Sequence, residues 1–137
     1  MYRTAELSAR DVGRKKQTWR FRLIMVFLLL PAALITLYTW AALHYVYSSG
    51  ERSGYIQKIS RKGWICKTWE GELAMTTVPG TAPLIFQFSV RNDATAQKIE
   101  QTAGQRVALT YEQHKGVPSS CFGETQYFII GVRPIGQ

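Results

Sequence analysis

Residues 23–43 read LIMVFLLLPAALITLYTWAAL, a run of 21 residues without a charged side chain. At about 1.5 Å per helical residue, this run spans the roughly 30 Å hydrocarbon core of a bilayer. A buried core helix is the alternative, but the 87 residues that follow Gly50 are too few to bury an apolar helix on all sides. The run therefore predicts one transmembrane helix, with Pro31 tolerated inside it as a kink at most.

Aromatic and basic residues flank this segment. Trp19 precedes it, and Trp40, Tyr45 and Tyr47 lie at its other end, as rings seated at the two headgroup levels do. Residues 1–22 hold seven basic and two acidic side chains, which is most of the formal net charge of +8. Because Lys and Arg are densest on the cytoplasmic side of a membrane span, we expect a cytoplasmic N-terminus and a periplasmic C-terminal domain.

A cleaved signal peptide would also show a basic leader before an apolar run. Here the apolar run is longer than the usual roughly 7–15 residues, and residues 39–45 offer a poor cleavage site. We interpret the segment as an uncleaved anchor. The chain then divides into a basic segment (1–22), the transmembrane helix (23–43), a polar connector (44–54) and a small domain (55–137).

The domain alternates apolar and polar residues with the two-residue period of β-strands, most clearly at residues 84–90. A helix is indicated between the third and fourth strands, with Asn92 or Asp93 as its N-cap and Gly104 beyond its end. In the second strand, the inner face is expected to hold Ile65, Trp69, Leu73 and Met75, and Gly71 interrupts this face with a bulge or a sharp bend. Strands are predicted at residues 55–60, 64–75, 84–90, 106–113 and 126–133, and the helix at 93–103.

The predicted order of elements is β-β-β-α-β-β, which is that of the OB-fold, a small and partly open Greek-key barrel. A barrel also leaves few exposed strand edges. Other small mixed sheets share this order of elements. We therefore expect one transmembrane α-helix plus a small, mostly-β domain with an OB-like architecture.

Patterns of catalytic or metal-binding residues are weak. His44 and His114 fit no HExxH or Cys/His ligand spacing, and we expect an interfacial and a surface histidine. Residues 119–121 (Ser-Ser-Cys) lack a G-x-S-x-G elbow, and Glu70 and Glu72 are expected on a solvated strand face. The chain has no glycine-rich phosphate loop and no room for a second domain. We expect no cofactor, no metal and no enzymatic activity.

Cys66 and Cys121 are the two cysteines of the chain. In an oxidising periplasm, a disulfide between them would close a 55-residue interval and contribute about 3–4 kcal/mol. Two unpaired, buried thiols are the alternative. α-Carbons farther apart than about 7 Å would exclude the bond.

Residues 55–72 interleave aromatic rings with basic side chains. On an OB-like barrel such a surface could stack bases and follow phosphates. In the alternative interpretation, the rings are core and interface residues while the basic side chains meet anionic lipid headgroups. We favour the second interpretation, because an exported domain seldom meets nucleic acid. The candidate binding surface comprises Tyr55, Lys58, Arg61, Lys62, Trp64, Lys67 and Trp69.

Two stretches, YSSGERSGYIQKISRKGWICKTWEGEL at residues 47–73 and FSVRND at residues 88–93, resemble a family of bacterial single-pass inner-membrane proteins of unknown function. Some members carry the name 6-phosphogluconate dehydrogenase, which does not suit a chain without a nucleotide loop or a second domain. The resemblance implies a bacterial inner-membrane anchor and no catalytic or ligand residues.

The sequence thus predicts a membrane-tethered, non-enzymatic binding or assembly module. Its expected partners are the lipid bilayer and a protein, for example in a membrane complex that it serves as an accessory subunit. One alternative is a domain that binds polyanions or nucleic acid through residues 55–72. The other is a small hydrolase built on residues 119–121.

Overall fold

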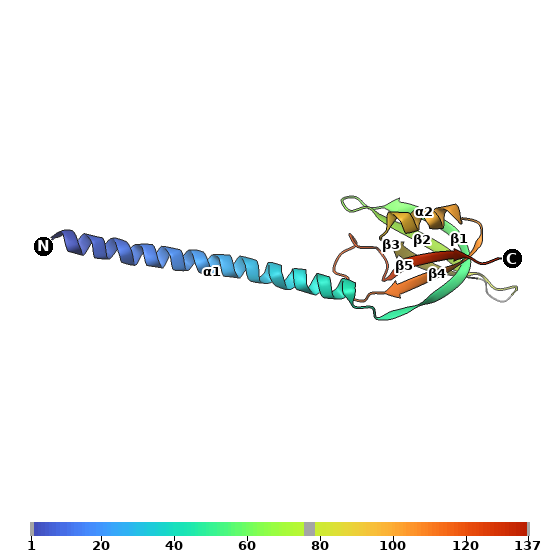
Figure 1. Cartoon of the computed structure of the whole chain (residues 1–137), viewed down its shortest axis with the longest axis horizontal. Coiled ribbons are helices and arrows are strands. Elements are labelled where there is room, and N and C mark those ends of the chain that lie inside the picture. Colours follow the sequence, from blue (N-terminus) through green and yellow to red (C-terminus); the bar gives the residue numbers. More distant parts are fainter. Residues whose placement is uncertain (1, 76–78, 137) are drawn as a thin grey trace. The chain divides into compact units, whose positions relative to one another are not determined.

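The computed structural model describes residues 2–75 and 79–136, with side chains from residue 17 onward (Figure 1). The chain divides into two compact units, residues 1–40 and residues 41–137. The first unit holds most of helix α1 (Tyr2–His44). The second holds the last turn of α1 and all the strands.

Helix α1 contains a segment, Gln17–His44, that is long and apolar enough to cross a membrane, and no other described helix is. It includes the predicted residues 23–43, with Pro31 inside the helix. The hydroxyls of Thr36 and Thr39 each donate a 2.8 Å hydrogen bond to the carbonyl oxygen four residues earlier. These polar groups are therefore satisfied within the helix, as an apolar environment requires.

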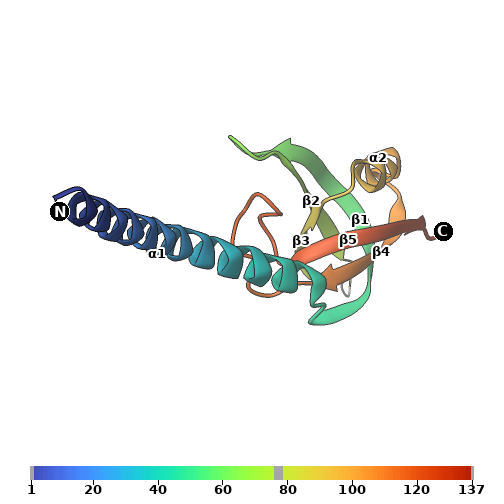
Figure 2. The ribbon, with the colours of Figure 1, turned by 60° about the vertical axis from the view of Figure 1, so that its left-hand side comes forward.

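The second unit is a five-stranded barrel with one helix, and this confirms the predicted small, mostly-β domain (Figure 2). The strands close in the order β1-β2-β3-β5-β4, and all neighbours are antiparallel except β3 and β5. The elements are β1 (Ser48–Lys62), β2 (Thr68–Met75), β3 (Leu84–Val90), α2 (Asp93–Gln101), β4 (Arg106–Gln113) and β5 (Tyr127–Pro134).

Strand β1 closes the barrel because it pairs with two neighbours. Residues 48–55 pair with β4, and residues 55–62 pair with β2. The two halves share Tyr55. At the preceding residue, Gly54, a Cβ atom would overlap the carbonyl oxygen of Ala74. A bulge at Gln57 follows and adds the bend that a small barrel needs.

The predicted connector, residues 44–54, is wrong for most of its length because β1 already begins at Ser48. The polar and glycine-containing sequence of this stretch suggested a loop. Its ladder with β4 is made by backbone groups, which need no apolar side chains. The connection to α1 is therefore three residues long, and Tyr47 N–H donates to the carbonyl oxygen of Gln113 at 2.8 Å.

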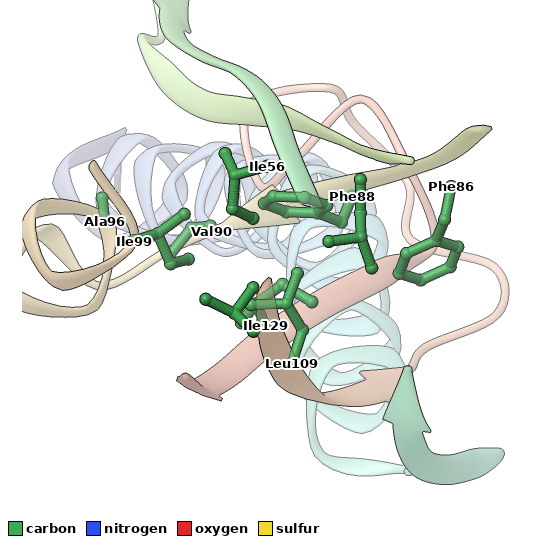
Figure 3. Packing of buried hydrophobic residues seen from close by; sticks show 10 residues of the cluster. Ile56, Phe86, Phe88, Val90, Ala96, Ile99, Leu109 and Ile129 are labelled. Atoms are coloured by element: carbon green, nitrogen blue, oxygen red, sulfur yellow. The ribbon is translucent and has the colours of Figure 1, made fainter. Parts of the chain in front are cut away.

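The core fills the barrel from one end to the other (Figure 3). Helix α2 is capped by Asn92, whose side chain accepts a hydrogen bond from Ala94 N–H. The helix buries Ala96 and Ile99 at one end of the cluster (Figure 3). Phe86 lies at the opposite end of the cluster. The other buried apolar residues of the cluster are Ile56, Leu73, Phe88, Val90, Val107, Leu109 and Ile129.

A guanidinium on an aromatic cluster covers the end of the core at Phe86. The rings of Phe86, Tyr111 and Tyr127 lie with centroids 5.0–5.7 Å apart. The Cζ atom of Arg52 lies 4.4 Å from the centroid of Phe86 and within 5.8 Å of the other two rings. Cation–π attraction therefore stabilises this end of the barrel.

An ion pair links β1 to β5 on the outside of the barrel. Arg133 Nη2 donates to Glu51 Oε2 at 2.9 Å, and both side chains are about half exposed or more. The hydrogen bond from Arg133 and the charge of its guanidinium lower the pKa of Glu51. The same hydrogen bond and the negative charge of Glu51 raise the pKa of Arg133. The stabilisation is present above the ordinary pKa of Glu51 and is lost as pH falls through the lowered value, but solvent screening keeps it small.

Two apolar side chains near the predicted starts of β2 and β3 are exposed. Strand β2 begins at Thr68, not at residue 64, so Ile65 lies in a loop and is 97% exposed instead of facing the core. Leu84 is 59% exposed because it lies at the first position of β3, where the packed core has ended.

Gly71 faces the interior of the barrel and pairs regularly with Ile59 and Phe88. A bulge or a sharp bend was expected at Gly71, and the bulge is wrong, since the register shift lies on β1 between Ile56 and Lys58. A Cβ atom at this position would overlap the ring of Phe88, which is fully buried. Glycine is required here because it leaves room for that ring.

Replacing Gly71 with alanine should lower the free energy of unfolding by about 1–3 kcal/mol, because the ring of Phe88 has no space to move into. The matched control is Gly131→Ala, also in a strand, where the nearest atom to a new Cβ would be Thr110 Oγ1 at 3.7 Å. Urea unfolding of the full chain in detergent micelles, followed by tryptophan fluorescence, measures both. Equal losses in the two variants would contradict the packing described here.

Candidate binding surface at the hairpin tip

The turn between β1 and β2 projects two apolar side chains into solvent. Residues 63–67, Gly-Trp-Ile-Cys-Lys, form this turn and are called the hairpin tip below. Trp64 and Ile65 have exposed fractions of 102% and 97%, the highest among the exposed large apolar residues. Side chains of this size are normally at least partly buried, so this exposed pair makes the tip a candidate binding surface.

A disulfide holds the tip in place. Cys66 is bonded to Cys121. Their α-carbons are 4.9 Å apart, well within the limit of about 7 Å for a disulfide. The bond joins the tip to residues 114–126, the β4–β5 loop. Between them lies an open groove of about 330 Å³, lined by Trp64, Ile65, Ser120 and Glu124 among others.

Glu70 fixes the β4–β5 loop over the outer face of the sheet. Its carboxylate accepts hydrogen bonds from Thr68 Oγ1 at 2.8 Å, Ser89 Oγ at 2.6 Å and Glu124 N–H at 3.0 Å. Glu70 is 6% exposed, so the expectation of a solvated strand face is wrong for this residue. The buried carboxylate is tolerated because its oxygens are satisfied by donors from two strands and the loop.

A second contact attaches the same loop to β3. Thr125 N–H donates to Ser89 Oγ at 3.0 Å, and the two hydroxyls lie 2.9 Å apart. Ser89 is fully buried. The loop is thus held at Cys121, Glu124 and Thr125, and the tip is attached to a stabilised surface.

The seven residues predicted as one binding surface do not lie together. Tyr55, Lys58 and Lys62 are exposed on the outer side of β1, whereas Trp64 and Lys67 belong to the tip. Trp69 packs against the core, and its indole N–H donates to Asp93 Oδ1 at 2.7 Å. The Arg61 guanidinium lies 5.9 Å from the Trp69 ring.

Strand pleating explains this division, since neighbouring residues of β1 and β2 face opposite sides. The residues that remain together at the tip are Trp64 and Lys67, with Lys62 at the end of β1. Sequence reasoning missed Ile65, which an overlong second strand placed in the core. The signal available in the sequence was the pair of apolar residues, Trp64 and Ile65, directly after Gly63.

His114 is buried, with 1% exposure, so the expected surface histidine is wrong. Its Nδ1 atom lies 3.3 Å from the carbonyl oxygen of Ala42, in the last turn of α1. Its Nε2 atom is 3.5 Å from Glu112 Oε2 but makes no hydrogen bond in the described part of the chain. The backbone of Ala42 and the ring of Phe128 both contact this buried histidine.

The residues considered for catalysis have structural contacts. Cys121 is bonded to Cys66, and Ser119 Oγ accepts a hydrogen bond from Cys121 N–H at 3.2 Å, which is a turn contact. Among the described residues there is no group of three or more His, Cys, Asp or Glu side chains that could hold a metal ion.

Replacing Glu70 with alanine should lower the free energy of unfolding by about 2–4 kcal/mol, because three donors lose a charged acceptor. The amide of Glu124 should exchange its hydrogen faster, since its acceptor is gone. Glu72→Ala is the control, because this half-buried carboxylate on the same face is expected to contribute less than about 0.5 kcal/mol. Hydrogen exchange and urea unfolding of the full chain in detergent provide the measurements, and unchanged exchange at Glu124 would contradict the anchoring role.

A comparison with curated proteins gives no match. The model of one protein family, described as a domain of unknown function (DUF8785), matches residues 46–136. This range covers the whole barrel, from two residues before β1 to two residues after β5, and leaves out α1. The chain therefore belongs to the DUF8785 family.

Proposed function

We propose that the protein is a membrane-anchored, non-enzymatic binding module that docks a protein partner through the hairpin tip. The single observation that carries this proposal is the complete exposure of Trp64 and Ile65 on a turn that a disulfide holds in place. A catalytic role would need a constellation of reactive groups, and the described contacts of Ser119, Cys121 and His114 serve the fold instead.

The tip has the properties of an interface anchor. Burying a tryptophan or an isoleucine side chain contributes roughly 1.5–3 kcal/mol, and tryptophan is enriched among residues that dominate binding energy. The disulfide and the attached β4–β5 loop limit the motion of the tip before binding. Less conformational entropy is then lost when a partner binds.

The charge around the tip indicates the kind of partner. Residues 52–69 contain Arg and Lys side chains but no Asp or Glu. Lys62 and Lys67 flank the two apolar residues and are exposed. A partner that offers an apolar pocket with acidic residues at its rim would complement this surface in both shape and charge.

The proposal includes an OB-like architecture and a bacterial inner-membrane location. The strand order β1-β2-β3-β5-β4 and the single helix between β3 and β4 support the OB-like assignment. The apolar segment of α1 supports a single membrane span, and the basic residues before it support a cytoplasmic N-terminus. The disulfide supports a periplasmic location of the barrel, where thiols oxidise.

Nucleic acid is not part of the proposal. OB-folds bind oligonucleotides on the outer face of the second and third strands. In this protein the β4–β5 loop covers part of that face, through the contacts of Glu124 with Glu70 and of Thr125 with Ser89. The carboxylate of Glu70 at its centre would repel phosphates, and Trp69 is packed against the core.

Photocrosslinking from the tip tests the docking surface. The full chain carries p-benzoylphenylalanine in place of Ile65, or in place of Ile130 as a control at an exposed apolar site on the barrel wall. After irradiation of membranes from the native host, the position 65 variant should yield a discrete protein adduct that is weaker when Trp64 is also alanine. The position 130 variant should not yield it.

Adducts with lipid alone at position 65 would mean that the tip contacts the bilayer and not a protein. Equal protein adducts at both positions would mean that capture is unspecific. Either result would contradict the proposed docking surface.

A further inference from the structure

The barrel has an open seam between β3 and β5. The two strands are paired at one position, Ser89 with Phe128. Along Leu84, Ile85, Phe86 and Gln87, strand β3 pairs with β2 on one side, and the described part of the chain provides no backbone partner on the other. Backbone N–H and C=O groups alternate between the two edges of a strand, so this stretch presents unpaired ladder groups.

A groove accompanies this free edge. It has a volume of about 350 Å³ and is lined by residues 85–87 on one side and 125–127 on the other. Phe86 and Tyr127 pack edge to face across it, with ring centroids 5.0 Å apart, and Ile85 is 44% exposed. Apolar and aromatic lining beside a free strand edge suits a side chain of an added strand.

A positive charge without an acidic partner lies on the same rings. The Arg52 guanidinium is 4.4 Å from the Phe86 centroid and 5.8 Å from the Tyr127 centroid. Its Nη1 atom donates to Met75 Sδ at 3.6 Å, a weak acceptor, and the described residues offer it no ion pair. The adjacent carboxylate, Glu51, is instead bonded to Arg133. A half-buried guanidinium in this position favours a carboxylate, which it can bind with two parallel hydrogen bonds.

We propose that the seam binds an extended peptide segment as an added strand along β3, with a carboxylate of that segment paired to Arg52. At about 3.3 Å per residue, the free edge of four residues is about 13 Å long and accepts a strand of about four residues. Neither a lipid nor a nucleic acid carries the amide ladder that complements a strand edge. The inference builds on the proposed function, because the peptide would belong to a protein partner, but it concerns a surface separate from the hairpin tip.

Selection from a phage-displayed library of random 12-residue peptides tests the seam, with the full chain in detergent micelles as the target. Enriched peptides should alternate apolar residues and carry an Asp, a Glu or a free C-terminal carboxylate. Fluorescence anisotropy of one enriched peptide should show at least about tenfold weaker binding to Arg52→Gln. Trp64→Ala should leave this binding unchanged, because the tip is a separate surface.

Two changes in the peptide test the same contacts without altering the protein, which matters because Arg52 also stabilises the barrel end. Exchanging the peptide carboxylate for an amide should weaken binding as much as Arg52→Gln does. N-methylation of its backbone amides should abolish binding, because methylated amides cannot donate to β3.

Three results would overturn the proposal: no enriched peptide, binding that tolerates both peptide changes, or binding that is lost in Trp64→Ala. The last result would locate the peptide at the tip, in favour of the proposed function and against the seam. If the seam bound peptide but the tip gave no protein crosslink, the seam proposal would stand and the proposed docking at the tip would be wrong.

Discussion

The double pairing of β1 is the constraint on which the rest of the barrel depends. One strand must follow β4 with its first half and β2 with its second, so it bends at Gly54 and Gln57. This bend brings the five strands into a closed order while β3 and β5 meet at one position only. Three residues separate this strand from α1, and the strand ends at the hairpin tip, so it connects the apolar helix to the candidate binding surface.

The hairpin tip is preorganised by contacts that are distant in sequence. Glu70 accepts from Glu124 N–H, and Cys66 is bonded to Cys121, which are separations of 54 and 55 residues. Both contacts hold the β4–β5 loop against the outer face of β2 and β3. A flexible turn with two exposed apolar residues would lose much of its binding free energy to ordering, whereas this one has been ordered by folding.

Local features of the sequence predicted the elements well, and long-range contacts account for the errors. The apolar run of α1, the alternation at β3 and the cap at Asn92 depend on neighbouring residues, and each was recognised. The strand at residues 48–54 was missed because only its pairing with β4 defines it. Buried Glu70 and exposed Ile65 were misplaced because their environments come from the loop and from the late start of β2. The candidate site was predicted in part, since Trp64 lies exposed in the turn before β2 whereas Trp69 packs against the core.

The thiol state of the full chain in its native host is the most direct test of a disulfide-held tip outside the cytoplasm. Cells are quenched with acid and treated with a maleimide–polyethylene glycol, with or without prior reduction, and Cys66→Ser serves as the control with one free thiol. With the disulfide formed, we expect the natural chain to shift in size only after reduction, while Cys66→Ser shifts without it. A shift of the natural chain without reduction would show free thiols, and both the linked tip and the periplasmic location would then be wrong.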